Sequence, residues 1–532
     1  MDENHLERRH CYASVRAPVF GRNVVATSQP LAAQAGVRML LRGGNAVDSA
    51  IAAAVTLTVV EPTMNGIGGD AFALVWDGQQ LHGLNASGRS PRAWTTGMFA
   101  GLTEMPTTGW QSITVPGAVS SWIELSRKFG VLPFSDLFAP AIEYARKGFM
   151  VSPFIAKTWA EVAAKYQEFE SFSDTFLPGG RAPLAGEVFR CKELAATLEE
   201  IADTFGESFY RGRLASAIAA YGRDTGGLLR EEDLGSHVPE WVEPVSASFD
   251  DYSVHEIPPN SQGIAALVAL ALLRDTEIAN VHPDSLKSLD LQLRAMFVAH
   301  SDIRSHVADP QYMDREAASL LSDEHLCILA RQMDVVPMTG HSLRQRQSGG
   351  DTVYLTTADS SGMMVSFIQS NYFDFGSGIV VPGTGISLHS RAACFSLDAH
   401  HPNVVDGGKR PFHTLSPAFV SFQGRPIMSF GVMGGPMQPQ GHVQMFLRVC
   451  VHGQNPQAAC DAPRWHVTAD GDVLLERGFA VPVLEELADY GFRVHDIEYG
   501  DPVFGSGQLA VSLPDGYCAA SDPRRDGQVA VL

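Results

Sequence analysis

The spacing of apolar residues changes about two thirds of the way along the chain. Before that point, apolar positions mostly recur every three or four residues, as in residues 30–41, 46–60 and 286–334, and this spacing predicts helices. From about residue 350, short runs rich in Val, Ile, Phe and Thr are separated by Gly, Asp and Ser, as strands and turns are. We therefore expect a protein of mixed α and β structure.

Local signals refine the first two thirds. Ser28, shortly before Pro30, is placed to cap the helix of residues 30–41. Residues 46–60 are apolar enough for a fully buried helix, but they are too few for the roughly 20 residues that span a bilayer. Residues 117–220 are mostly helical by pattern, and residues 250–270 read as a strand, a loop and a helix.

Two glycine-containing segments flank a predicted hairpin strand. Asp77-Gly78 joins the apolar runs 72–76 and 80–84, which is a strong hairpin signal. Residues 65–71 formally match GxGxxA, a dinucleotide-binding pattern. That pattern requires a strand before it and a helix after it, and here the order is reversed. We interpret the segment as a tight loop in which the backbone approaches a neighbour closely.

Composition excludes several classes of protein. The chain has 532 residues, a formal charge of −20 and 45% hydrophobic residues, which argues against disorder and against binding to nucleic acid or anionic membranes. The first 20 residues lack the pattern of a secretory signal, and the seven cysteines form no CxxC, so a reducing cytoplasm is expected. We see no metal-ligand spacing.

Three further segments could carry chemistry, and each also has an ordinary structural interpretation. Gly434-Gly435 follows a predicted strand and could aim N–H groups at an oxyanion, although such pairs are usually turns. Thr352 begins a strand after two glycines, and His413 lies in a loop bounded by prolines. Taken singly, none of the three predicts a function.

Together with other ordered segments, they resemble the γ-glutamyltranspeptidase family of N-terminal-nucleophile hydrolases along nearly the whole chain. Among the segments that carry the resemblance are GGNAVDSAIAAAVTLTVVEPTMNGIGGDAF, PPNSQG, DIRSHVADP, GDTVYLTTAD, HPNVVDGGKRPFHTLSPAFV and GVMGGPMQPQGH. The resemblance implies a four-layer αββα sandwich. It also implies that a precursor cuts itself into fragments 1–351 and 352–532, which stay together as one intertwined domain.

The resemblance further implies the catalytic residues. Cleavage after Asp351 would make Thr352 an N-terminal nucleophile, whose α-amine, with an ordinary pKa of about 7.7–8.0, serves as base for its own hydroxyl. The family's supporting Thr corresponds to Ser370, and its Asn two residues later to Tyr372, with Asn371 one position early. The oxyanion glycines correspond to Gly434 and Gly435.

The substrate-binding positions depart from the γ-glutamyl pattern. The acidic residue that holds a substrate amine corresponds to Cys394, and the position three residues earlier is Arg391. The paired serines that hold a carboxylate correspond to His413 and Thr414. The family's carboxylate-binding Arg falls on Ser87, with Arg89 displaced by two residues.

These departures predict an amidohydrolase for a small amide that carries an anion and no ammonium, because Arg391 would attract a carboxylate. By resemblance, the expected reaction is hydrolysis of oxamate to oxalate and ammonia, in purine or allantoin nitrogen catabolism. The alternatives are a γ-glutamyl hydrolase or transpeptidase, a cephalosporin-acylase-like amidase, and a non-catalytic binding protein. No cofactor or metal is expected, and the expected partners are the amide and the other fragment, in a heterodimer or a dimer of heterodimers.

Overall fold

The computed structural model describes residue 12, residues 16–334 and residues 351–532, with only the backbone of Asp351. Most of residues 1–20, and Gly349 and Gly350, lie outside these residues. Two seven-stranded antiparallel sheets form the centre of the molecule. In spatial order the first contains β1 (Val19–Gly21), β20 (Gly516–Ser521), β19 (Ser506–Leu513), β15 (Arg425–Met433), β14 (Ala418–Phe422), β9 (Tyr252–Glu256) and β8 (Val245–Phe249).

The second sheet alternates between the two parts of the chain. Its order is β21 (Gln528–Val531), β2 (Val24–Thr27), β10 (Asp351–Ala358), β11 (Met364–Tyr372), β3 (Asp70–Trp76), β4 (Leu81–Asn85) and β7 (Glu240–Val242). Strands before residue 351 therefore pair with strands after it on both sides of the β10–β11 hairpin. The two expected fragments share one sheet.

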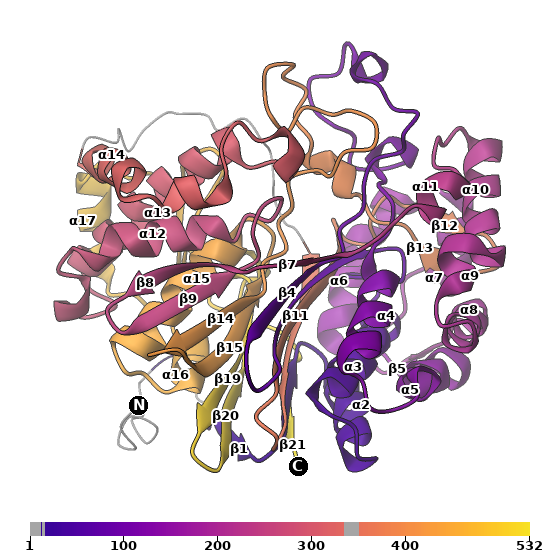
Figure 1. Cartoon of the computed structure of the whole chain (residues 1–532), viewed down its shortest axis with the longest axis horizontal. Coiled ribbons are helices and arrows are strands. Elements are labelled where there is room, and N and C mark those ends of the chain that lie inside the picture. The colour runs from indigo at the N-terminus through magenta and orange to yellow at the C-terminus, as the bar shows by residue number, and fades with distance from the viewer. Residues whose placement is uncertain (1–11, 13–15, 335–350) are drawn as a thin grey trace.

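A layer of helices covers the outer face of each sheet (Figure 1). The second sheet is contacted by α2 (Pro30–Leu41), α3 (Ala46–Val60) and α4 (Ala118–Phe129). The same apolar core extends outward to α5 (Phe134–Lys147), α6 (Pro153–Tyr166), α7 (Glu170–Phe176), α8 (Lys192–Asp203), α9 (Glu207–Arg211), α10 (Arg213–Thr225) and α11 (Glu231–Gly235). The first sheet is contacted by α12 (Ile264–Arg274), α15 (Met437–Phe446) and α16 (Pro456–Asp461). Its apolar core extends outward to α13 (Leu286–His306), α14 (Asp323–Met333) and α17 (Val481–Asp489).

A third apolar core lies between the two sheets. It contains side chains from facing strands, such as Phe72 and Tyr354 from the second sheet and Phe419 and Ala510 from the first. Small sheets outside the sandwich are β5 (Phe149–Met150) with β6 (Val188–Phe189), β12 (Val380–Val381) with β13 (Ile386–Ser387), and β16 (Trp465–Val467) with β17 (Val473–Glu476) and β18 (Val494–Ile497). The predicted αββα sandwich is confirmed.

Most predicted local elements form, and one capping prediction is wrong. The helix of residues 46–60 is fully buried, and Asn45 and Asp48 form a capping box at its start. The hairpin around Asp77 is present. The cap of α2 is Gln29, whose side chain accepts two backbone N–H bonds. Ser28 cannot cap it, because its hydroxyl instead donates to the buried Glu61 carboxylate at 2.6 Å.

The tight-loop interpretation is confirmed for residues 65–69, whereas Asp70 and Ala71 already belong to β3. A Cβ atom on Gly68 would lie 2.3 Å from the carbonyl oxygen of Ser387, and one on Gly69 would lie 2.7 Å from that of Ser370. Only glycine permits this approach. The loop therefore packs directly against the end of β11, where the candidate site lies.

Candidate active site

Thr352 lies at the start of β10, in the middle of the second sheet. It is buried, and its Oγ1 donates to Oγ of Ser370 on β11 at 3.4 Å. The Ser370 oxygen in turn accepts the backbone N–H of Tyr372 at 2.7 Å. The register of β10 and β11 shifts between Asp351 and Val353, so the pairing is irregular at Thr352 itself. The predicted nucleophile and its supporting hydroxyl are therefore adjacent on rigid strands.

Tyr372 ends β11 in a conformation that is rare for an aromatic residue. Its φ is +77°, in the left-handed region that glycine favours. Such backbone strain is concentrated at functional sites. The Tyr372 ring stacks on the guanidinium of Arg391, with Cζ 4.3 Å from the ring centroid. This contact joins the end of β11 to the next part of the site.

Arg391 begins a 3₁₀ helix, Arg391–Cys394, and is fully buried. Its Nη1 donates to Oγ1 of Thr414 at 2.8 Å and to the Cys394 sulfur at 3.8 Å. Its Nε and Nη2 have no hydrogen-bond partner among the described residues. Burial raises the pKa of the Cys394 thiol, so no thiolate neutralises the guanidinium at neutral pH. Arg391 is a buried cation with unused donors.

Asp70, at the start of β3, holds the histidine that sequence reasoning selected. One Asp70 oxygen accepts the N–H groups of Gly88 and Gly117, and the other lies 3.2 Å from Nε2 of His413. His413 Nδ1 accepts the N–H of Leu415, so the network assigns the His413 proton to Nε2.

Burial sets the charge of this group. It raises the pKa of Asp70 to about 7, although Arg391 opposes the shift. Burial, reinforced by Arg391, lowers the pKa of His413 well below its ordinary value, so His413 is neutral. A second buried histidine, His389, lies 3.6 Å from the same Asp70 oxygen, and burial lowers its pKa to about 3. Near neutral pH, Asp70 is therefore only partly ionised, and His389 and His413 carry no charge.

Gly434 and Gly435 form the bend between β15 and α15. Both have positive φ, +127° and +57°, and a Cβ on Gly434 would lie 3.0 Å from Cα of Gly505. The side-chain amide of Gln262 donates to the carbonyls of Gly435 and Thr414, at 2.8 and 2.7 Å. Gln262 therefore ties the glycine bend to the loop that carries His413 and Thr414.

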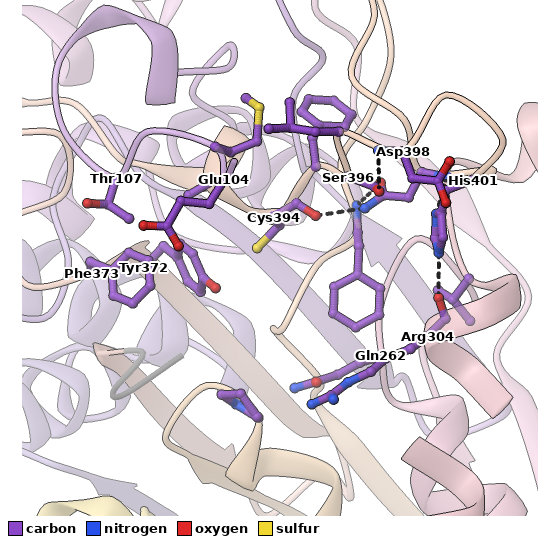
Figure 2. A pocket seen from close by; sticks show the side chains of 18 of the residues that line it. Glu104, Thr107, Gln262, Arg304, Tyr372, Phe373, Cys394, Ser396, Asp398 and His401 are labelled. Atoms are coloured by element: carbon purple, nitrogen blue, oxygen red, sulfur yellow. Dashed lines mark hydrogen bonds between the residues drawn. The ribbon is translucent and has the colours of Figure 1, made fainter. Parts of the chain in front are cut away.

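A cavity of about 400 Å³ opens beside this group (Figure 2). Its wall includes Tyr372 and Cys394 from the site, and Pro436 next to the glycine pair. The remaining lining residues are Thr103, Glu104, Met105, Thr107, Gln262, His300, Arg304, Val307, Phe373, Ala393, Phe395, Ser396, Leu397, Asp398, His401, Asn403 and Phe412. Tyr372 lines the cavity and also stacks on Arg391, so it links the cavity to the buried arginine.

The predicted residues form one connected group except for Arg89. Arg89 is half-buried, donates to Asp309 at 2.6 Å and lies 3.7 Å from Glu240. These carboxylates already balance its charge. Sequence reasoning assigned no role to Asp70, His389, Gln262 or Arg304. Three of them lie in the segments NGIGGDAF, PPNSQG and DIRSHVADP, so the signal was present, but the contacts that give these residues roles join distant parts of the chain.

Two facing sheets between helical layers, with a buried threonine at the start of a central strand, are the arrangement of an N-terminal-nucleophile hydrolase. The chain belongs to the γ-glutamyltranspeptidase family, whose model matches residues 32–532. The fold is also that of a cephalosporin acylase from Bacillus halodurans, with 45% identity, 99% of this chain and 98% of that chain covered, and a TM-score of 0.92.

Two proenzymes are each 34% identical in sequence to this chain. One is a glutathione hydrolase-like proenzyme of Bacillus subtilis, aligned over 95% of this chain and 98% of its own. The other is the oxamate amidohydrolase proenzyme of Klebsiella pneumoniae, aligned over 94% and 96%. The predicted family is confirmed, and the protein is a hydrolase that acts on amide bonds.

The described residues include neither a membrane-spanning helix nor a cluster of metal ligands. No helix among them is both long and apolar enough to cross a bilayer. In the same part of the chain, no group of three or more His, Cys, Asp or Glu side chains is arranged to hold a metal ion.

Proposed function

We propose that the protein is a self-processing amidohydrolase that hydrolyses a small anionic amide, with oxamate as the first candidate. The observation that carries this proposal is Arg391, a buried cation with two unused donor nitrogens next to Thr414. A γ-glutamyl substrate would bring an ammonium group toward this cation, whereas oxamate brings a carboxylate. The Klebsiella pneumoniae relative supports the choice of oxamate.

The proposed reaction begins with cleavage between Asp351 and Thr352, because the Thr352 nitrogen can act as a base only after it becomes a free amine. Thr352 Oγ1 then attacks the amide carbonyl, and the amine takes the hydroxyl proton. N–H groups of Gly434 and Gly435 hold the oxyanion, and each such donor contributes about 3–4 kcal/mol. The amine returns the proton to the leaving ammonia, and water hydrolyses the acyl-Thr352 ester.

The substrate-binding roles follow from the contacts of the site. Arg391 holds the carboxylate, assisted by Thr414 and by the neutral His413, whose orientation Asp70 fixes. Tyr372 covers Arg391 on the cavity side and limits the size of what reaches it. Arg89 has the weakest support, since Asp309 and Glu240 already engage it. We include it as a residue to test.

The setting of the reaction belongs to the same proposal. Few cysteines and an acidic chain favour the cytoplasm, and oxalate and ammonia as products fit purine or allantoin nitrogen catabolism. The other cleavage fragment is the proposed partner, in a heterodimer that can pair with a second one. The interleaved strands of the second sheet support lasting association of the fragments.

Two measurements on purified protein test this function. Intact-mass analysis should detect a species that begins at Thr352, and processed protein should release ammonia from oxamate. Thr352→Ala should stay whole and release no ammonia above background, whereas Thr352→Ser, which keeps a hydroxyl, should retain cleavage. Turnover of a γ-glutamyl anilide without any turnover of oxamate would replace the proposed substrate class.

A second candidate, an acylase for larger amides, is favoured by the size of the cavity. A volume of about 400 Å³ is far more than oxamate fills, and it lies in the about 300–1,000 Å³ range of pockets for drug-sized ligands. The 45% identity with a cephalosporin acylase points the same way. Activity on a cephalosporin side-chain amide that exceeds activity on oxamate would make this the main function.

A further inference from the structure

Arg304 is a second cation of the cavity, and the proposed chemistry does not use it. It lies in the last turn of α13, and its side chain extends into the cavity together with that of Gln262 (Figure 2). Its Nη1 is buried and has no hydrogen-bond partner, and it forms no ion pair with any described residue. Its backbone carbonyl accepts a hydrogen bond from His401 at 2.6 Å, which fixes the end of the helix.

Arg304 pairs with no described carboxylate, although the exposed Asp470 attracts it electrostatically. The neighbouring His300 is neutral, because burial and then Arg304 lower its pKa well below its ordinary value. Burial also lowers the pKa of Arg304 to about 10, which still leaves it protonated at neutral pH. The acids of the cavity wall, Glu104 and Asp398, are exposed, and neither pairs with Arg304 among the described contacts.

The buried Nη1 of Arg304, which has no hydrogen-bond partner, carries a desolvation cost in the folded protein. Its position in the last turn of α13 returns a small part of this cost through the helix dipole. The cost is removed when an anion binds in the cavity, because Arg presents a planar set of donors that matches a carboxylate.

We propose that Arg304 is a specificity-determining residue, which binds a second carboxylate of the substrate in the cavity beside the Thr352 site. Arg391 stacks on the Tyr372 ring, and Tyr372 and Arg304 both line the cavity. The substrates that use both cations are amides with two carboxylates, one next to the scissile carbonyl for Arg391 and one remote for Arg304, as in an N-oxalyl amino acid. The inference rests on the proposed function, and it adds a second anion to the substrate class.

Binding of product-like anions tests the subsite without requiring catalysis. Processed protein is titrated by calorimetry with glutarate, which has two carboxylates, and with butyrate, which has one. We expect wild type to bind glutarate at least ten times more tightly than butyrate. Arg304→Gln should reduce this ratio to near one, and Arg304→Lys should restore part of it. Arg331→Gln, which removes an exposed arginine of α14 outside the cavity, should leave the ratio unchanged.

Kinetics then separate a substrate role from a structural one. With N-oxalylglycine, which has two carboxylates, Arg304→Gln should raise KM at least tenfold, and with oxamate, which has one, it should leave KM within twofold of wild type. An unchanged glutarate-to-butyrate ratio in Arg304→Gln or Arg304→Lys, or no glutarate preference in wild type, overturns the inference. If the ratio falls as expected but no amide is hydrolysed, the subsite stands and the proposed function fails.

Discussion

Two buried arginines in this molecule have opposite surroundings. Arg524, near the C-terminus, uses all three guanidinium nitrogens, which donate to Glu476, Asp522 and the carbonyls of Cys460 and Ala462. Arg391 is just as buried, but only its Nη1 donates hydrogen bonds. The carboxyl that Arg391 attracts electrostatically is Asp70, and burial raises the pKa of Asp70 to about 7.

The difference distinguishes a structural charge from a functional one. Asp522 and Glu476 neutralise Arg524 completely, and the coulombic attraction of Arg464 and Arg524 keeps the pKa of Asp522 low despite burial. Nothing described in the structure neutralises Arg391 to that extent. A buried cation with unused hydrogen-bond donors, as Arg391 is, provides what a binding site for an anion requires.

The largest effect should come from breaking the complete network. Asp522→Asn leaves Arg524 and Arg464 with less negative charge in a buried place, so we expect the free energy of unfolding to fall by about 3–5 kcal/mol. Denaturant unfolding measures this change. The exposed pair, Arg477 with Asp496, provides the control, and Asp496→Asn should leave the free energy of unfolding nearly unchanged. KM for the substrate should not change, and equal losses in the two variants would contradict the comparison.

An intermediate effect should appear in how stability depends on pH. Because burial raises the pKa of Asp70 from 3.8 to about 7, the folded protein holds this proton more tightly than the unfolded chain does. The resulting stabilisation is complete below about pH 3.8 and is lost as the pH rises through about 7. Asp70→Asn cannot lose the proton and should therefore lose less stability than wild type does between pH 5 and pH 8.

Urea unfolding at the two pH values measures this difference. Asp489→Asn, at an exposed position of α17, should follow wild type. If Asp70→Asn also follows wild type, Asp70 does not titrate between pH 5 and pH 8, and the inferred rise of its pKa is wrong.

The smallest effect is expected at Cys394, a weak acceptor for Arg391 at 3.8 Å. Cys394→Ser replaces the sulfur with a smaller but stronger acceptor. Because the two changes oppose each other, we expect the free energy of unfolding to change by less than about 1 kcal/mol. Thermal unfolding checks this value, and the KM for oxamate should move by a similarly small amount. A large loss of either would show that Cys394 is a main partner of Arg391.

Sequence patterns predicted the parts of the fold that depend on local order. The buried helix of residues 46–60, the hairpin at Asp77 and the close-packed glycine loop all form as expected. The cap of α2 was wrong because Ser28 bonds to Glu61, 33 residues away, which local spacing cannot reveal.

The site was partly predictable for the same reason. Family resemblance placed Thr352 and Ser370, which the structure brings to 3.4 Å. It could not show that Tyr372 stacks on Arg391 or that Asp70 orients His413, because these contacts depend on how β3, β11 and two loops meet. Arg304 lies in a segment that the resemblance includes, yet only the structure shows that it lines the cavity and that its Nη1 has no hydrogen-bond partner among the described residues.

The alternation of strands in the second sheet has a consequence for how the protein must be made. A cut before Thr352 would leave β10 and β11 between β2 and β3, so each fragment would depend on the other for hydrogen-bonded neighbours. One continuous chain can assemble this sheet by intramolecular steps. Once cut and unfolded, the fragments would have to find each other by diffusion, so recovery would depend on concentration. Cleavage would thus convert a chain that can refold into one that normally assembles only once.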